Sequence, residues 1–177
     1  MSTISEITKI GFGGGCHWCT EAVFQALQGV ISVEQGWIAS FDQQSSFSEA
    51  VIVHFKEADI SLETLIEVHL STHKSSSNHS MREKYRSAVY SFSESQRKQS
   101  KEIIQNFQHQ FDNKLITEVY AFKSFKPSPG DIQNYYKKDP LKPFCTKYID
   151  PKLRVLKDQF ERQINREMIT VLNAKES

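Results

Sequence analysis

The 177-residue sequence has few of the features that would assign it quickly to a class. Its three cysteines are too few, and odd in number, for a secreted scaffold held together by disulfides. No apolar run approaches the length of a membrane span, and residues 1–6 are too polar for a signal peptide. The net charge of +1 gives no overall attraction to nucleic acid or to a membrane surface. We therefore expect a cytoplasmic protein whose cysteines are kept for chemistry in a reducing compartment.

The most informative segment covers residues 7–30, which read as a strand, a glycine turn and a helix. Thr8, Ile10 and Phe12 alternate with other residues in the manner of a strand. The glycines at 13–15 permit backbone angles that larger residues resist. From position 16 onward, one stripe at helical spacing contains Cys19, Ala22, Val23, Ala26, Leu27 and Val30.

Cys16 opens this helical segment, and that position suits a reactive thiol. A free cysteine has a pKa of about 8.5, so only a small fraction is thiolate at neutral pH. The unpaired N–H groups and partial positive charge of a helix N-terminus favour the thiolate. Cys19 follows one turn later on the same face and could close a disulfide with Cys16. The competing interpretation is that both cysteines are small buried apolar residues.

The rest of the chain alternates strand-like and helical patterns. Strands are predicted at residues 30–38, 50–55, 85–92 and 115–122. Helices are predicted after Ser61, after Ser93 in a capping-box pattern with Gln96, over residues 131–138, and from Asp150 and Pro151 onward with a stripe of Leu153, Leu156, Phe160, Ile164 and Met168.

This alternation predicts an α/β (α+β) fold, a two-layer sandwich with a ferredoxin-like core and a C-terminal extension. Short loops between some strands favour this fold over a doubly wound sheet. The length suits a single domain over residues 1–177. Within it we expect a core at 7–145 and a helical C-terminal extension at 146–177.

The segment GGGCHWCTEAVFQALQGV resembles the active-site segment of the peptide methionine sulfoxide reductase A family, usually GGCFWxxE. Later segments match in order. EAVIVHF at 49–55 resembles the family's glutamate strand, YRSAVY at 85–90 resembles YRSAIF, and TEV at 117–119 resembles a later TE segment. QNYY at 133–136 falls at HQxY and keeps its final tyrosine, and Phe144-Cys145 falls where many members carry a resolving cysteine. The resemblance therefore covers residues 7–145.

The resemblance implies reduction of methionine-S-sulfoxide, free or in peptides and proteins, to methionine. It implies that Cys16 is the nucleophile, Glu49 the proton donor and Tyr85 a hydrogen-bond partner of the sulfoxide oxygen. A carboxyl group in an apolar site has a raised pKa and can stay protonated near neutrality. The first product on the enzyme is a cysteine sulfenic acid. A second thiol then forms a disulfide and releases water.

Two resolving thiols remain possible at this stage, because Cys19 is nearest in sequence and Cys145 could carry the disulfide to the surface. By the same resemblance, Trp18 forms one wall of the pocket for the S-methyl group, and Tyr136 occupies a pocket position. No bound cofactor or metal is implied. Thioredoxin or a similar dithiol would act as the reductant and partner.

The sequence also departs from the family pattern. His17 replaces a phenylalanine, and Trp37 replaces a tyrosine that helps to bind the sulfoxide oxygen. Ser80 replaces an aspartate, and Arg82 and Lys84 replace a glycine and a glutamine in the same loop. His17 could help to form the thiolate, and His79 could partly replace the aspartate. These changes make the preferred substrate the open question.

Three other functions remain open from the sequence. The C-x-x-C pattern is also typical of thioredoxin-like oxidoreductases, but these place a cis-proline against the thiols and this chain has no proline before Pro127. A metal-binding module could use Cys16, Cys19, His17 and Cys145, although a second clustered ligand pair is missing. A relative could also bind methyl sulfoxides without reducing them. Zinc retained in the purified protein would identify the metal-binding module. Binding of a sulfoxide without product formation would identify the non-catalytic relative.

Overall fold

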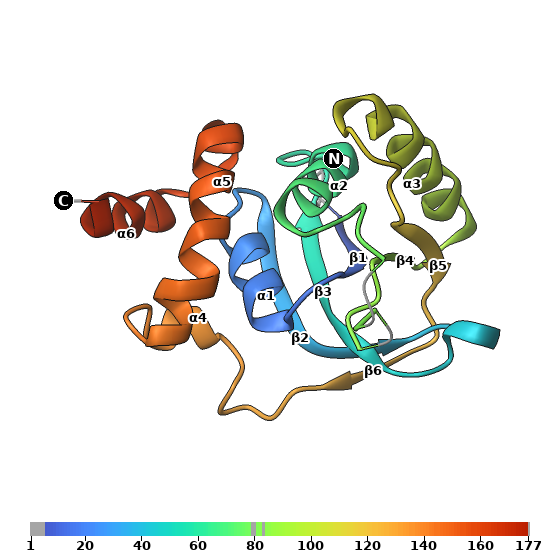
Figure 1. Ribbon diagram of the computed structural model, residues 1–177, viewed down its shortest axis with the longest axis horizontal. Helices are drawn as coiled ribbons and strands as arrows, with labels where there is room; N and C mark the ends of the chain where they lie inside the picture. Colours follow the sequence, from blue (N-terminus) through green and yellow to red (C-terminus); the bar gives the residue numbers. More distant parts are fainter. Residues whose placement is uncertain (1–5, 79–80, 83, 177) are drawn as a thin grey trace, which may run out of the picture.

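A six-stranded sheet forms one layer of the computed structural model, which describes residues 6–78, 81, 82 and 84–176 (Figure 1). The strand order is β5-β4-β1-β3-β2-β6. Its four central strands are β1 (Ile7–Gly13), β2 (Val30–Ala39), β3 (Ser48–Lys56) and β4 (Ala88–Ser91). Neighbours among these four pair antiparallel in the order β4-β1-β3-β2. This is the arrangement of a ferredoxin-like unit, and the predicted fold class is confirmed.

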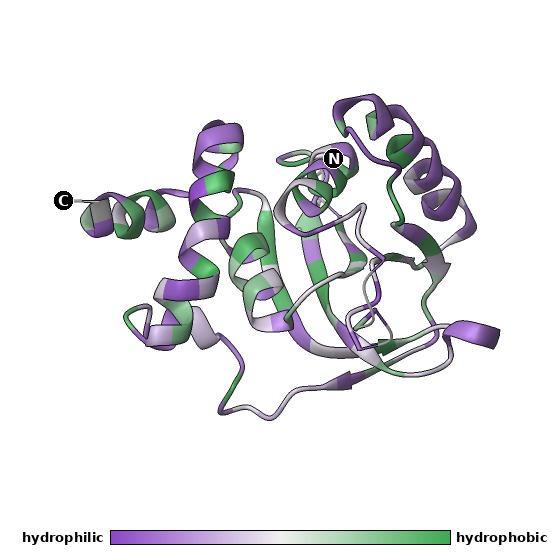
Figure 2. Ribbon diagram, viewed as in Figure 1, coloured by the Kyte–Doolittle hydropathy of each residue, from purple (hydrophilic) through white to green (hydrophobic). Residues whose placement is uncertain are grey.

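Helices α1 (His17–Gln25) and α2 (Leu62–Thr72) connect the central strands and share one apolar core with them. Inward residues of β1 and β3, such as Phe12 and Val53, are fully buried in this core beside Leu65 of α2. Figure 2 shows the apolar colouring concentrated on the strands and α1, whereas α3 (Glu94–Phe107) is largely hydrophilic. Burial of these alternating and striped apolar residues is the main force that holds the helices on the sheet.

The helix starts predicted from capping patterns are confirmed. The Ser61 hydroxyl accepts a hydrogen bond from the Thr64 N–H at 3.0 Å at the start of α2. The Ser93 hydroxyl accepts one from the Gln96 N–H at 3.1 Å. The Gln96 side chain in turn accepts from the Phe92 N–H at 2.8 Å, one residue earlier than in a standard capping box.

The outer strands follow the sequence patterns less closely. Strand β5 (Glu118–Ala121) lies parallel to β4 and is shorter than the predicted strand at 115–122. Strand β6 (Ser124–Pro127) pairs with the edge of β2 and was not predicted, because its four residues show no apolar alternation. The predicted strand at 85–92 begins only at Ala88, since the preceding backbone bonds to a side chain instead of a neighbouring strand: the Arg86 N–H donates to the Ser48 hydroxyl at 2.8 Å.

The C-terminal part is built from short helices. These are α4 (Tyr135–Lys138), a π-helical turn (Cys145–Ile149), α5 (Asp150–Phe160), a 3₁₀ turn (Glu161–Gln163) and α6 (Arg166–Glu176). Two further 3₁₀ turns lie earlier in the chain, at Asp42–Gln44 and Gln108–Gln110. Figure 1 shows α5 beside α1 and α6 at the outer edge. Among the described residues, no helix combines the length and the apolar character needed to cross a bilayer.

The prediction of one continuous apolar stripe from Leu153 to Met168 on a single last helix is wrong. The chain leaves the helix after α5, and Ile164 forms a β-bridge with Leu27. The Asn165 N–H donates to the Ala26 carbonyl at 2.8 Å, and the Asn165 side chain accepts from the Met168 N–H at 2.9 Å. Ile164 and Met168 are both buried, as the stripe predicts. Pairing with Ala26 and Leu27, just after α1, nevertheless interrupts the helix between them.

Candidate active site

The glycine turn before α1 is shaped by close packing. Gly14 has a φ of +155°, and a Cβ there would lie 2.5 Å from the His73 ring. A Cβ on Gly13 would lie 2.9 Å from the carbonyl oxygen of Arg86. Side chains are therefore excluded at these positions, and the turn delivers Cys16 to the start of the helix.

Cys16 is half-buried at the N-terminus of α1, and its carbonyl accepts from the N–H groups of Cys19 and Thr20, each at 3.1 Å. The pKa of the Cys16 thiol is lowered, chiefly by a hydrogen bond from the Cys19 thiol and also by the Trp18 and Cys19 N–H groups. Burial and the Glu49 charge oppose this effect. The pKa of Cys19 is raised by the same hydrogen bond and by burial. Cys16 is therefore the thiolate of the pair, and Cys19 is its donor.

The two sulfurs open into a cleft of about 410 Å³, which we call the thiol cleft. Its lining comes from the glycine turn, the end of α2, the loop before β4 and the C-terminal helices. The residues are Gly14, Gly15, Cys16, Cys19, His73, Lys74, Met81, Tyr85, Phe144, Tyr148 and Lys152. The structure thus brings the predicted nucleophile, the nearer resolving thiol and Tyr85 to one cleft.

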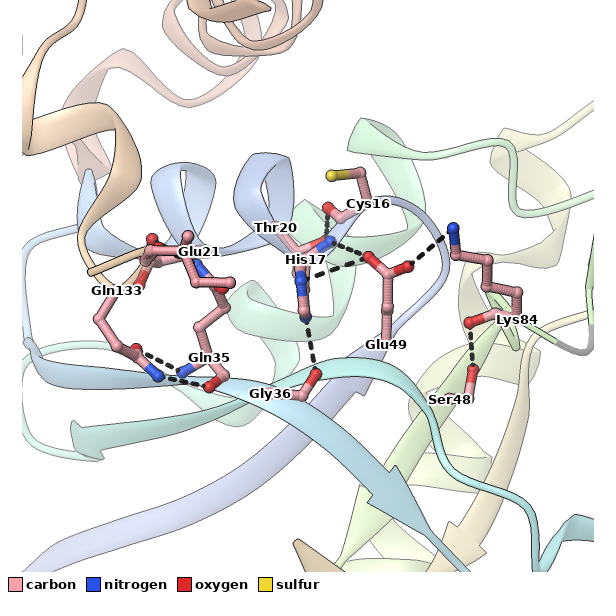
Figure 3. Close-up of polar contacts among 11 residues, drawn as sticks. Cys16, His17, Thr20, Glu21, Gln35, Gly36, Ser48, Glu49, Lys84 and Gln133 are labelled. Carbon is pink, nitrogen blue, oxygen red and sulfur yellow. Dashed lines mark hydrogen bonds and ion pairs between the residues drawn. The ribbon is translucent and has the colours of Figure 1, made fainter. Parts of the chain in front are cut away.

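Glu49 lies at the beginning of β3 beside a second group of side chains, the carboxyl cluster, formed by His17, Trp37, Glu49 and Lys84. Only 6% of Glu49 is exposed. Its carboxyl group accepts from the His17 N–H at 3.2 Å and lies 3.5 Å from His17 Nε2 and 3.6 Å from Lys84 Nζ (Figure 3). Trp37 is opposite Glu49 in the sheet, and its ring meets the His17 ring edge-on at 5.1 Å. The surroundings of this carboxyl group are polar, whereas the sequence analysis expected an apolar site.

The His17 ring has a defined orientation in the carboxyl cluster. Its Nδ1 lies 2.8 Å from the carbonyl oxygen of Gly36, which can only accept, so Nδ1 carries a proton. The Nε2 atom then faces Glu49 Oε1, and the two attract each other only when one of them is protonated.

The carboxyl cluster and the thiol cleft lie on different sides of the start of α1. In Figure 3 the Cys16 sulfur points away from the Glu49 carboxyl group. The two groups are still coupled, because the Glu49 charge raises the pKa of Cys16. Glu49 also accepts from the N–H of the residue that follows Cys16. The acid candidate and the thiolate therefore share one helix terminus.

Trp18 belongs to an aromatic group beside the thiol cleft. Its ring stacks on Tyr135 with 4.2 Å between centroids and meets Phe144 edge-on at 5.1 Å. Phe144 also lines the thiol cleft. Trp18 is thus positioned as part of an apolar wall near Cys16, and its role toward a substrate stays a prediction.

Two further predicted site residues, Tyr136 and Cys145, are buried outside both the thiol cleft and the carboxyl cluster. Tyr136 is buried, and its hydroxyl donates to Asp150 Oδ1 at 2.8 Å. Cys145 is 0% exposed, with its sulfur 3.5 Å from the carbonyl oxygen of Asp139. Burial raises the pKa of Cys145, and Cys145 and Cys19 belong to the same apolar core. Passing a disulfide to the surface through Cys145 would require its segment to move.

The loop that departs from the family pattern is only partly described, because Ser80 and His79 lie outside the described residues. Arg82 donates from Nη1 to the carbonyl oxygens of Gly14 at 2.8 Å and Tyr85 at 2.9 Å. Arg82, which replaces a glycine of the family pattern, therefore connects the glycine turn to Tyr85, which lines the thiol cleft.

Glu21 is a buried residue that the sequence analysis missed. It is 0% exposed and accepts from Gln35 Nε2 at 2.9 Å, the Asn134 N–H at 2.9 Å and the Tyr135 N–H at 3.1 Å (Figure 3 shows its position near Gln133 and Gln35). Burial raises its pKa. It fixes the segment that carries Tyr135 against α1. An acidic residue inside the otherwise apolar stretch EAVF was the available signal.

A buried histidine pair behind the glycine turn was missed as well. His69 Nε2 donates to the Gly13 carbonyl at 2.7 Å, and His73 Nε2 lies 2.8 Å from the Ser87 hydroxyl. Burial lowers the pKa of His69 to about 4 and holds that of His73 well below its usual value. Both rings are neutral at pH 7 and support the turn as structural groups.

The three cysteines are free thiols. Within residues 6–78, 81, 82 and 84–176, no group of three or more histidine, cysteine or acidic side chains is arranged to hold a metal ion.

Comparison with known proteins identifies the family. The family described as Peptide methionine sulfoxide reductase matches residues 8–164. The chain belongs to this family. It is 31% identical to the peptide methionine sulfoxide reductase MsrA of Trichodesmium erythraeum (strain IMS101) over 175 residues, covering 90% of this chain and 99% of that protein. The MsrA of Sulfolobus acidocaldarius is 30% identical over 162 residues, with coverage of 84% and 92%. The predicted family and enzyme class, an oxidoreductase, are confirmed.

Solved structures of similar proteins confirm the fold. Reduced Mxr1 from Saccharomyces cerevisiae aligns with a TM-score of 0.69 at 20% identity, covering 82% of this chain and 92% of Mxr1. Methionine sulfoxide reductase A of Corynebacterium diphtheriae aligns with a TM-score of 0.67 at 19% identity, covering 76% of each chain. The mixed α/β core described above is therefore the fold of these reductases.

Proposed function

We propose that this protein reduces methionine-S-sulfoxide, free or within peptides and proteins, to methionine. The observation that carries the proposal is the Cys16 thiolate at the start of α1, which shares that terminus with the buried Glu49 carboxyl group. Membership of the reductase family supports the same reaction. A thiolate supplies the nucleophile, and a carboxyl group beside a titratable ring supplies the proton.

In the first step, the Cys16 sulfur attacks the electrophilic sulfur of the substrate. The sulfoxide oxygen is a poor leaving group until it is protonated, and Glu49, whose carboxyl group lies 3.5 Å from His17 Nε2, would donate this proton. The oxygen is transferred to Cys16, which becomes a sulfenic acid, and methionine is released. Tyr85, which lines the thiol cleft, would hydrogen-bond the sulfoxide oxygen.

In the second step, Cys19 attacks the Cys16 sulfenic acid. A Cys16–Cys19 disulfide forms and the oxygen leaves as water. The hydrogen bond between the two thiols in the reduced protein supports Cys19 as the first resolving residue. Cys145 would follow it, because both thiols belong to the same apolar core.

Reduction of the disulfide requires an external dithiol, and we assign this role to thioredoxin or a similar protein, with no bound cofactor. Mxr1 has been crystallised in complex with Trx2, and this chain aligns with that structure with a TM-score of 0.59 at 20% identity. The small, odd number of cysteines supports a cytoplasmic location, where thiols stay reduced.

The remaining site assignments extend this proposal. Trp18 would form a wall of the pocket for the S-methyl group. His17 and Trp37 would contact the substrate from the side of the carboxyl cluster. Tyr136 would act only indirectly, through the segment it anchors. The chain would work as one domain over 1–177, with its core at 7–145 and its extension at 146–177, since α5 residues share the core with α1.

An assay with separate R and S epimers of a blocked methionine sulfoxide, with dithiothreitol as reductant, tests the proposal. We expect product from the S epimer only. Cys16→Ser should lower the rate by at least about a thousandfold, because the nucleophile is lost. Cys145→Ser, which removes a buried thiol, should still form methionine in the first turnover. The proposal would be contradicted if Cys16→Ser reduced the S epimer, or if the native chain did not reduce it.

A further inference from the structure

Lys152 brings a positive charge to the thiol cleft from α5, far along the chain from the two cysteines. Its half-buried side chain lines the cleft together with Cys16 and Cys19. Its ammonium group donates to the carbonyl oxygen of Thr72 at the end of α2. In the part of the chain that the structure describes, it has no carboxylate partner. A half-buried ammonium group without a carboxylate is costly, so its effect on the neighbouring thiols matters.

The thiols are the anionic neighbours of this lysine. Burial lowers the pKa of Lys152, whereas the charges of Cys19 and Cys16 raise it, with Cys19 the stronger. The reciprocal effect is present at Cys19, whose pKa is lowered by Lys152 against several raising influences. The geometry and the charges therefore connect Lys152 mainly with the second cysteine.

The two steps of the reaction make different demands on Cys19. Before the first step, Cys19 must stay protonated, because its thiol donates to the Cys16 thiolate. After that step, Cys16 is a neutral sulfenic acid, and the anion that kept Cys19 protonated is gone. Burial still opposes ionisation of Cys19, and Lys152 favours it. The form of a thiol that attacks another sulfur is the thiolate.

We propose that Lys152 is a positioning residue whose ammonium group stabilises the Cys19 thiolate that attacks the Cys16 sulfenic acid. In this step the Cys19–Cys16 sulfur–sulfur bond forms and the sulfur–oxygen bond on Cys16 breaks. The leaving hydroxide takes up the proton that Cys19 released and departs as water. The lysine remains charged throughout. This inference rests on the proposed function, since it concerns the second half of the same reaction.

Other titratable groups around the lysine do not replace its charge. The titratable groups that line the cleft with it are Cys16, Cys19, His73, Lys74, Tyr85 and Tyr148, and its charge also acts on His69. The two histidines are neutral at pH 7, as described above. Lys74 is exposed, so solvent screens it, and Arg82 donates its guanidinium hydrogens to backbone carbonyls.

The experiment isolates the second step from sulfoxide reduction. Reduced protein is treated with one equivalent of hydrogen peroxide, which oxidises Cys16 to the sulfenic acid directly. The acid is trapped with dimedone at successive times, and the disulfide is counted by mass spectrometry. The native chain is compared with Lys152→Met, with Lys152→Arg and with Arg154→Met. Arg154 is an exposed residue of the same helix and controls for the loss of one positive charge.

We expect disulfide formation in Lys152→Met to be about tenfold slower at pH 7, because a smaller fraction of Cys19 is then thiolate. Lys152→Arg and Arg154→Met should stay within about twofold of the native rate. The difference for Lys152→Met should shrink as the pH rises and Cys19 ionises without help. A purely structural role would slow the reaction equally at all pH values.

An unchanged rate in Lys152→Met, or equal losses in Lys152→Met and Lys152→Arg, would overturn the inference. Thermal unfolding checks that each variant is folded. If Lys152→Met unfolds, Lys152→Gln keeps a donor for the Thr72 carbonyl and takes its place. Methionine formed from the S-sulfoxide in the first turnover is measured in parallel. Its absence in the native chain would refute the proposed function, while the peroxide experiment would still decide the role of Lys152.

Discussion

The carboxyl cluster and the thiol cleft meet at the start of α1, yet the chain builds them in different ways. Two members of the carboxyl cluster, Trp37 and Glu49, lie on adjacent strands and are paired by their register, and His17 of α1 and Lys84 of a loop complete it. The thiol cleft gathers side chains from α1, the end of α2, a loop and α5. The carboxyl group proposed as the proton donor is thus carried by the sheet. Sulfur chemistry depends on packing between helices, where a disulfide has to form and open.

The strongest test of this division is Glu49→Gln, which changes the carboxyl cluster alone. The amide can still accept from the His17 N–H, but it cannot donate the proton that the sulfoxide oxygen needs. We expect methionine formation in the first turnover to fall by about 10²–10⁴-fold. Oxidation of Cys16 by peroxide and closure of the disulfide should continue.

The matched control is Glu34→Gln, the same chemical change on an exposed residue of β2 that pairs with His54 at 2.6 Å. It should leave methionine formation unchanged. A native-like first turnover in Glu49→Gln would show that the carboxyl cluster does not supply the proton to the sulfoxide oxygen.

A second test concerns the buried histidines that support the cleft side. Burial lowers the pKa of His69 to about 4, below its value of about 6.5 in the unfolded chain. The stability that neutral His69 contributes is therefore present above pH 6.5 and is lost as the pH falls from 6.5 toward 4. The loss is about 3 kcal/mol of unfolding free energy, with His73 acting in the same direction.

Urea unfolding between pH 7 and pH 4 measures this effect. His69→Gln, which keeps a donor for the Gly13 carbonyl, should unfold with a shallower pH dependence than the native chain. His109→Gln, at an exposed histidine, should keep the steep dependence. Equal slopes in all three proteins would mean that the buried pair does not destabilise the cleft in acid.

The smallest effect is expected from Cys19→Ala, which changes the cleft side without touching Glu49. Loss of the thiol hydrogen bond should raise the pKa of Cys16, because that bond is the main cause of its lowering. We expect about tenfold less thiolate at pH 7 and a correspondingly slower alkylation of Cys16 by iodoacetamide. The pH dependence of alkylation, followed on the Cys16 peptide by mass spectrometry, gives the shift.

Cys145→Ala provides the comparison, since it removes a buried thiol that is hydrogen-bonded to Asp139 instead. Its Cys16 should be alkylated at the native rate. An unshifted Cys16 profile in Cys19→Ala would assign the low pKa to the backbone N–H groups alone.

The N-terminal half of the fold could be predicted from the sequence because its signals are local. The glycine turn, the Ser61 cap and the apolar run of β3 each act over a few residues. The C-terminal part could not, since its course depends on distant partners. Ile164 fits a helical stripe by spacing, but pairing with Leu27 takes it out of the helix.

The positions of the candidate site residues could likewise be predicted only in part. The family resemblance pointed to Cys16 and Glu49, and the structure places both at one helix terminus. Spacing could not reveal Lys152, which reaches the cleft from α5, because no motif connects positions 16 and 152. Nor could it show that a polar cluster surrounds Glu49, since the His17 and Lys84 contacts arise only when β3, α1 and a loop come together.

The β-bridge between Leu27 and Ile164 has a consequence for synthesis of the protein. The helix that carries both reactive thiols is covered by α5 and held at its far end by residues 164 and 165. Those closing residues leave the ribosomal exit tunnel well after α1 and the sheet have done so. The far end of the thiol-bearing helix is therefore fixed late in folding, after the sheet on which it packs has been synthesised.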